Sequence, residues 1–193
     1  MKILFVSHWL VNVETLGPGK RMVLWFAGCS KDCPGCCAPK LQSTTDASEC
    51  DPVELANFVN SKMKEYKLNG LTLSGGDPLE QDSEALELFL KHIETRDILL
   101  YTGYDLNEVK ELPIYETLKR NIAVLKCGKY IRALDDNNIL KGSSNQTITY
   151  FKEEYKKVYK SYISSQNRGL QIFYSGKEAF YAGLPTNAIF DNI

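Results

Sequence analysis

Three cysteines within eight residues constrain this chain more than any other feature. They lie in the segment Cys29-Ser-Lys-Asp-Cys33-Pro-Gly-Cys36. Three thiolates on one short loop can bind three irons of a cubane cluster and leave the fourth iron without a protein ligand. An iron with an open position can bind a small molecule and act on it, whereas a cluster with four cysteine ligands mostly carries electrons. The spacing requires an irregular loop, because each thiolate must reach a different corner of one small cube.

Two other interpretations of the cysteines need comparison. A structural zinc site would need a fourth ligand, which Cys37, Cys50 or Cys127 could supply. A disulfide framework is disfavoured, because there is no signal peptide, the chain exceeds the size that needs covalent staples, and adjacent Cys36 and Cys37 pair poorly. Six cysteines in such a chain indicate a reducing compartment, which we expect to be the cytoplasm.

The bulk properties predict one globular domain without a nucleic-acid or membrane role. At 193 residues with 44% hydrophobic content, the chain can bury a substantial core in a single domain. Its net charge is −1 and it has no basic tract, so nothing indicates a nucleic-acid surface. Residues 1–6 are apolar but few, which predicts a strand and not a targeting segment, and no apolar run approaches the length of a membrane span.

Signals for strands and helices alternate along the chain, which predicts an α/β fold with parallel strands. Residues 22–26 form a continuous apolar run typical of a strand buried on both faces. The segment Asp51-Pro-Val-Glu54 combines an N-cap, a proline at the first helical position and a glutamate three residues after the cap, so a helix begins there. Further strands are predicted at 71–73, 98–101 and 122–125, and further helices at 83–94 and 106–111.

The chemically distinctive residues follow strands. In parallel α/β folds the chemistry lies at the carboxyl ends of the strands. The cysteine loop, Ser74-Gly-Gly-Asp77, Thr102-Gly103 and Cys127-Gly128 all follow predicted strands, so we expect them to line one pocket. The glycine pair at 75–76 lets a backbone approach a cofactor closely, although Gly-Gly-Asp-Pro is also strong turn chemistry in any protein.

Together, the two motifs resemble the signatures of the radical S-adenosylmethionine (SAM) superfamily. Those signatures are a CxxxCxxC loop after the first strand and a GGE-like motif after the second, which reads Gly75-Gly76-Asp77 in this chain. Within the superfamily, the chain resembles the small activating proteins of anaerobic ribonucleotide reductases. The stretches that carry this likeness are Gly17-Pro-Gly19 with Arg21, Cys33–Cys36, Ser74–Leu79, Tyr101–Tyr104 and Gly142–Gln146, so that it spans about residues 17–146.

The resemblance implies a fold and two cofactors. A complete eight-stranded barrel takes about 250 residues, so the expected fold is α/β, an incomplete parallel (β/α) barrel of the radical SAM type. Cys29, Cys33 and Cys36 would ligate a [4Fe-4S] cluster, and SAM would chelate the unique iron through its amino and carboxylate groups. One electron would then cleave SAM to methionine and a 5′-deoxyadenosyl radical. No catalytic side chain beyond the cluster and SAM is expected.

The resemblance also implies cofactor contacts and partners. We expect the backbone around Gly35 and Cys37 to lie near the adenine, and Ser74, Gly75, Gly76 and Asp77 to lie near the methionyl amine. Thr102, Ser143 and Asn145 would line the rest of the pocket. In family members the radical takes a hydrogen from a glycine on a large glycyl-radical enzyme, an anaerobic ribonucleotide reductase. Flavodoxin or ferredoxin would donate the electron.

Two positions depart from the family pattern. Cys37 stands where the residue after the third cysteine is usually aromatic, and Cys127 stands where an aspartate is common before the glycine. For Cys127 we favour a small apolar filler over a catalytic thiol, because free cysteine is commonly buried.

Residues 147–193 extend beyond the point where members of the family usually end. Phe151, Tyr155, Val158, Tyr159 and Tyr162 predict an amphipathic helix, and residues 169–183 predict a hairpin that turns near 175–176. The expected organisation is a core of 1–146 with a helix-plus-hairpin extension of 147–193 packed on it, in a single globular domain. We favour a role in covering the sheet edge over docking of a partner.

The functional prediction is therefore a radical SAM enzyme that generates a glycyl radical on an anaerobic ribonucleotide reductase. One alternative is a radical SAM enzyme that modifies a peptide or a small molecule. A second alternative, of another class, is a non-catalytic iron–sulfur or zinc protein.

Overall fold

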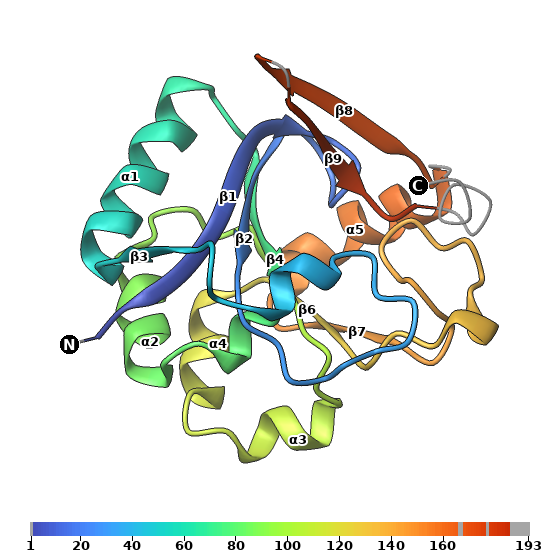
Figure 1. Cartoon of the computed structure of the whole chain (residues 1–193). Coiled ribbons are helices and arrows are strands. Elements are labelled where there is room, and N and C mark those ends of the chain that lie inside the picture. The colour runs from blue at the N-terminus through green and yellow to red at the C-terminus, as the bar shows by residue number, and fades with distance from the viewer. Residues whose placement is uncertain (1, 166–167, 177, 186–193) are drawn as a thin grey trace.

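Seven strands form one mixed sheet at the centre of the protein (Figure 1). The structure is a computed structural model that describes residues 2–165, 168–176 and 178–185. The strands lie in the order β3-β1-β2-β4-β5-β6-β7. Their bounds are β1 Leu4–Val13, β2 Arg21–Phe26, β3 Ser48–Cys50, β4 Gly70–Gly75, β5 Ile98–Tyr101, β6 Val124–Cys127 and β7 Thr147–Tyr150.

The four central strands, β2, β4, β5 and β6, run parallel, as the alternation of strand and helix signals predicted. The strands on either side do not. β1 is antiparallel to β2 and to β3, and β7 is antiparallel to β6. The first strand was expected at residues 1–6, but β1 continues to Val13 and forms a hairpin with β2. The fold is thus mixed α/β with a parallel centre, and its closure into part of a barrel stays a prediction.

Four helices cover one face of the sheet. Asp51 caps the first as predicted, because its carboxylate accepts hydrogen bonds from the backbone N–H groups of Val53 and Glu54. Their apolar faces pack on side chains that alternate along the strands. One of the four, α4, was not predicted. The bounds are α1 Pro52–Glu65, α2 Ser83–His92, α3 Leu106–Glu111 and α4 Tyr115–Asn121; short 3-10 turns lie at η1 Pro39–Gln42, η2 Pro78–Glu80 and η3 Arg132–Leu134.

The C-terminal segment covers the other face. It consists of α5 (Glu153–Ser165) and a hairpin of β8 (Leu170–Ser175) and β9 (Glu178–Gly183), which agrees with the predicted helix and turn. Tyr159 and Tyr162 of α5 are buried there, but Val158 is 46% exposed, so the apolar stripe is narrower than predicted. β7, the first part of the predicted extension, belongs to the main sheet. Residues 186–193 lie outside the described residues.

A buried polar network ties this second face together at the amino ends of the strands. Arg21 is fully buried, and its Nη1 lies 2.9 Å from Asp97 Oδ2. Its Nε donates to the hydroxyl of Thr72 at 2.8 Å, and the Tyr159 hydroxyl donates to Asp97 Oδ1 at 2.6 Å. A Cβ at Gly17 would collide with the Arg21 side chain. This explains why the first position of the Gly17–Gly19 motif is a glycine.

We expect Tyr159→Phe to lower the free energy of unfolding by about 1.5–3 kcal/mol, because the lost hydrogen bond is made to a buried charged group. Urea denaturation measures this. Tyr155→Phe is the matched control, since Tyr155 lies on the same helix, is half-buried and makes no side-chain hydrogen bond to the described residues. Equal losses in the two variants would contradict the importance of the Tyr159–Asp97 bond.

Candidate active site

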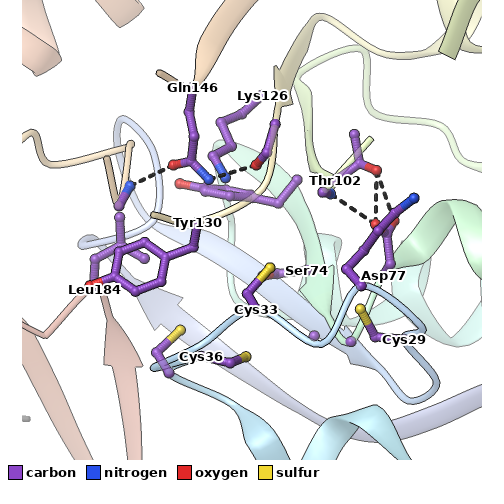
Figure 2. Close-up of a pocket in the computed structure, with 18 of the residues that line it drawn as sticks. Cys29, Cys33, Cys36, Ser74, Asp77, Thr102, Lys126, Tyr130, Gln146 and Leu184 are labelled. Carbon is purple, nitrogen blue, oxygen red and sulfur yellow. Dashed lines mark hydrogen bonds between the residues drawn. The ribbon is translucent and has the colours of Figure 1, made fainter. Parts of the chain in front are cut away.

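The carboxyl ends of β2, β4, β5 and β6 meet at one cavity, as their positions in the sequence predicted (Figure 2). The cavity encloses about 820 Å³ of empty space, counting its open mouth. Segments far apart in the sequence contribute to it. Its walls are formed by Cys29, Lys31, Cys33, Cys36, Cys37, Ser74, Gly75, Gly76, Asp77, Tyr101, Thr102, Gly103, Lys126, Gly128, Tyr130, Asp135, Gly142, Gln146, Arg168, Leu184 and Pro185.

The cysteine loop leaves β2 and presents all three thiols to this cavity. Cys36 N–H donates to the carbonyl of Cys33 at 3.0 Å, which forms a tight turn between two of the cysteines. Gly35 lies in this turn at a φ of +75°. Burial raises the pKa of the Cys29 thiol to about 11, and it also raises the pKa of Cys36. Free Cys29 and Cys36 are therefore protonated near neutral pH, and a metal that binds these two thiols must displace their protons.

The Gly75–Gly76 pair is required by contact between two backbones. Gly75 has a φ of +118°, and a Cβ there would collide with the backbone of Phe26. A Cβ at Gly76 would collide with the carbonyl of Gly28. The N–H of Gly76 donates to Phe26 O, and that of Asp77 donates to Gly28 O, both at 2.8 Å. The glycines thus fix the loop that follows β4 against the start of the cysteine loop.

Asp77 connects the loop that follows β4 to the loop that follows β5. Its carboxylate accepts hydrogen bonds from the Thr102 hydroxyl at 2.9 Å and from the N–H groups of Gly103 at 2.8 Å and Leu79 at 3.0 Å. Burial raises the pKa of Asp77 to about 6, although these donors oppose the rise. Cys29, Asp77 and Glu80 have ligand atoms within 4.8 Å of one another. We do not assign a metal ion to this group, because hydrogen bonds already engage the carboxylates of Asp77 and Glu80.

Two buried polar side chains face the cavity without a hydrogen-bonding partner in the described part of the chain. The hydroxyl of Tyr101 is buried and makes no hydrogen bond with any described residue. Lys126 is 8% exposed and forms neither an ion pair nor a hydrogen bond with a described residue; its ammonium lies 5.4 Å from the centre of the Tyr101 ring. Burial lowers the pKa of Lys126 to about 8. Buried polar groups normally have partners, so these two are available to a polar, anionic ligand.

Cys127 lies on the opposite side of the sheet from Lys126. Successive side chains of a strand point to opposite faces, and Cys127 packs in the apolar cluster beneath the helices. It is 1% exposed and does not line the cavity. This agrees with the predicted role of an apolar filler. Cys37, by contrast, lines the cavity beside Cys36.

The structure brings most of the predicted site residues to the cavity but not all of them. The three cluster cysteines, Cys37, Ser74, Gly75, Gly76, Asp77 and Thr102 line it. Gly35, Ser143 and Asn145 do not. Gly35 is exposed, beside the side chains of Arg132 and Tyr130. The Ser143 hydroxyl accepts a hydrogen bond from Ile131 N–H, and the Asn145 side chain donates to Lys129 O. From the Gly142–Gln146 motif, Gly142 and Gln146 form the wall instead.

Sequence reasoning missed several residues of the wall. Lys126 and Tyr101 could have been found, because successive side chains of a strand point to opposite faces, which places both on the face opposite Leu100 and Leu125. Gln146 closes its loop by donating to Gly128 O at 2.7 Å and accepting from Gly142 N–H at 2.8 Å. Arg168, Leu184 and Pro185 come from the extension, and no local pattern in the sequence indicates them.

Residues 15–149 match the family model described as a 4Fe-4S single cluster domain. Together with the three-cysteine cavity, this match defines an iron–sulfur protein with one cluster site. The match ends just before the C-terminal helix, so α5 and the hairpin lie outside it.

Curated relatives narrow this class. A protein of Enterobacteria phage T4 is 33% identical over 137 residues, which cover 68% of this chain and 85% of the relative. A protein of Haemophilus influenzae is 35% identical over 143 residues, which cover 70% of this chain and 91% of the relative. A protein of Pasteurella multocida is 33% identical over 154 residues, which cover 76% of this chain and 97% of the relative. All three are named anaerobic ribonucleoside-triphosphate reductase-activating protein. The chain belongs to this family of activating proteins, which confirms the part of the predicted resemblance that concerns these activating proteins.

We expect Gly75→Ala to lower the free energy of unfolding by more than about 3 kcal/mol, because it combines an unfavourable φ with a collision against a neighbouring strand. Gly176→Ala is the control: Gly176 has a φ of +61° in the β8–β9 turn, with no atom within 4 Å of an added Cβ. Gly176→Ala should lower the free energy of unfolding by only about 1–2 kcal/mol. Urea denaturation of both variants measures the difference, and similar losses would show that the backbone contact at Phe26 matters little.

Proposed function

We propose that this protein is a radical SAM enzyme that generates a glycyl radical on an anaerobic ribonucleoside-triphosphate reductase. The observation that carries the proposal is the composition of one cavity. Three thiols of a single loop lie opposite two buried polar groups, those of Tyr101 and Lys126, that make no side-chain hydrogen bond or ion pair with another described residue. The names of the relatives support the choice of reductase as the partner. We infer also that the open sheet corresponds to the incomplete (β/α) barrel of that superfamily.

The residues present fit a cluster and a SAM molecule. Cys29, Cys33 and Cys36 would hold a [4Fe-4S] cluster at the cavity floor. When bound, the cluster and SAM supply one-electron cleavage of the sulfonium to methionine and a 5′-deoxyadenosyl radical, which takes a hydrogen atom from a glycine of the partner. The chain's own contribution is placement and exclusion of water.

Lys126 and Tyr101 are suited to orient the methionyl part of SAM. The Lys126 ammonium provides a buried positive charge for the carboxylate, and charge-assisted hydrogen bonds of this kind are the strong ones. The Tyr101 hydroxyl can donate a further hydrogen bond from the same wall. Ser74 and the glycine pair lie at the end of β4, where Gly76 contacts Gly28 just before the first cysteine, and would flank the amino group.

The open mouth of the cavity would admit a glycine-bearing segment of the reductase. We further propose flavodoxin or ferredoxin as the electron donor and the cytoplasm as the compartment. Among the described residues, no helix is both long and apolar enough to cross a bilayer.

We expect Cys33→Ala to lose the iron and sulfide that the wild-type protein binds on anaerobic reconstitution, and to form no 5′-deoxyadenosine with dithionite and SAM. Cys37→Ala, in the same loop and cavity, should keep both, because only three cysteines are needed as ligands. Metal analysis and product chromatography measure the outcome. Loss of metal in both variants would favour a four-cysteine site, and zinc in place of iron would overturn the proposal.

The reductase partner is tested by electron paramagnetic resonance. Reduced, reconstituted protein is mixed with SAM and an anaerobic ribonucleoside-triphosphate reductase, and a glycyl-radical doublet is expected on the reductase. With Cys33→Ala the doublet should be absent. SAM cleavage by the wild-type protein without a doublet would instead favour a peptide or small molecule as the substrate.

We expect Lys126→Met to weaken SAM binding by at least tenfold, since it removes the only unpaired buried cation that the described residues place in the cavity. Because the free ammonium has a pKa of about 8, SAM affinity of the wild-type protein should fall as pH rises from 7 to 9. That fall should be absent in Lys126→Met. Equilibrium dialysis of SAM across this range tests both, and a pH-dependent fall that persists in the variant would assign it to another group.

A further inference from the structure

The C-terminal extension reaches the cavity as well as the sheet. Leu184 and Pro185 follow β9 and line the cavity, and so does Arg168, which precedes β8. In Figure 2, Leu184 lies beside Tyr130 on the Cys36 side of the cavity, away from Asp77 and Thr102. These three residues fall beyond residue 149, where the family match ends.

Arg168 joins the extension to the connection between β6 and β7. Its Nη1 lies 2.8 Å from Asp135 Oδ2, and the two side chains are only 3% and 4% exposed. Its Nε donates to Asn138 O at 3.1 Å, and its Nη2 donates to Lys141 O at 2.6 Å. Nη1 also donates to Pro185 O at 3.4 Å. One planar guanidinium thus binds both the connection and the end of the hairpin.

Both segments that Arg168 joins are walls of the cavity. The β6–β7 connection supplies Gly128, Tyr130, Gly142 and Gln146 to the lining, and the hairpin end supplies Leu184 and Pro185. A buried ion pair is strongly disrupted when one partner is removed, because the other charge is left without compensation. Loss of Arg168 would therefore release two adjacent parts of the same wall.

A second anchor holds the hairpin independently of Arg168. The Gln171 side chain accepts from Thr15 N–H at 3.2 Å and donates to Asn12 O at 3.2 Å, and the Thr15 hydroxyl donates to Ala182 O at 2.8 Å. These bonds fix the hairpin to the β1–β2 turn. The hairpin can thus stay in place on the sheet when its contact with the β6–β7 connection is altered.

We propose that the extension forms part of the SAM pocket: Arg168 is a positioning residue that seats Leu184 and Pro185 as an apolar wall for the adenosyl half of SAM. This inference rests on the proposed function. Apolar side chains suit a flat adenine ring, whereas the methionyl half requires the polar groups on the opposite side. The extension thus contributes to cofactor binding, in addition to covering one face of the sheet.

The test measures ligand affinity in the full-length, reconstituted protein, independently of turnover. Equilibrium dialysis with SAM, S-adenosylhomocysteine and L-methionine is carried out for wild type, Arg168→Gln, Arg168→Lys and Leu184→Ala. The matched control is Arg96→Gln, which removes an exposed arginine whose nearest carboxylate, on Glu154, lies 4.0 Å away. Iron content and thermal midpoint are recorded for each protein.

We expect Arg168→Gln to lower the affinity for SAM and for S-adenosylhomocysteine by at least tenfold. Leu184→Ala should lower both affinities by about three- to tenfold. The affinity for methionine should be unchanged in both variants. Arg168→Lys should fall between wild type and Arg168→Gln, because it keeps the charge but not the planar fork. Wild-type affinity in both Arg168→Gln and Leu184→Ala would overturn the inference, as would an equal loss for methionine. A wild-type protein that binds iron but no SAM would overturn the proposed function itself, and this inference with it.

Discussion

The buried ion pair between Arg21 and Asp97 is the interaction on which the rest of the structure depends. Removing one member of such a pair leaves a charge without compensation and costs about 3–5 kcal/mol. Arg21 lies at the start of β2 and donates to Thr72 of β4, while Asp97 lies just before β5 and accepts from Tyr159 of α5. One network therefore connects three parallel strands and the helix that covers them. Because it lies at the amino ends of these strands, it also fixes where their carboxyl ends meet.

The relative register of the strands determines the chemistry of the cavity. Tyr101 of β5 pairs in register with Lys126 of β6, and both side chains point to the face that α5 covers. A shift of one residue would turn Lys126 toward the helices and Cys127 toward the cavity. A buried cation would then be lost from the site and a thiol would take its place. The network at the amino ends of the strands thus helps to determine which side chains face the cavity at their carboxyl ends.

Much of the site could be predicted because it follows local rules. The cysteine spacing and the position of each motif after a strand placed Cys29, Ser74 and Thr102 at one cavity, as the structure shows. The antiparallel pairing of β1 and β7 could not be predicted in this way, because apolar runs do not reveal strand direction. The positions of Ser143 and Asn145 depend on how Gln146 folds its loop back onto Gly128 and Gly142, which is a tertiary effect.

The C-terminal extension covers one face of the sheet along the whole length of the strands. The face that it covers carries Val23, Trp25 and Leu99, and exposure of these side chains to water would be unfavourable. α5 is anchored at the amino ends of the strands through Tyr159 and Asp97, and Arg168 lies at the carboxyl ends beside the cavity. An element that covers a sheet from one end to the other necessarily reaches the carboxyl ends, where the chemistry lies. Protection of the sheet and formation of the cavity wall therefore follow from one packing arrangement.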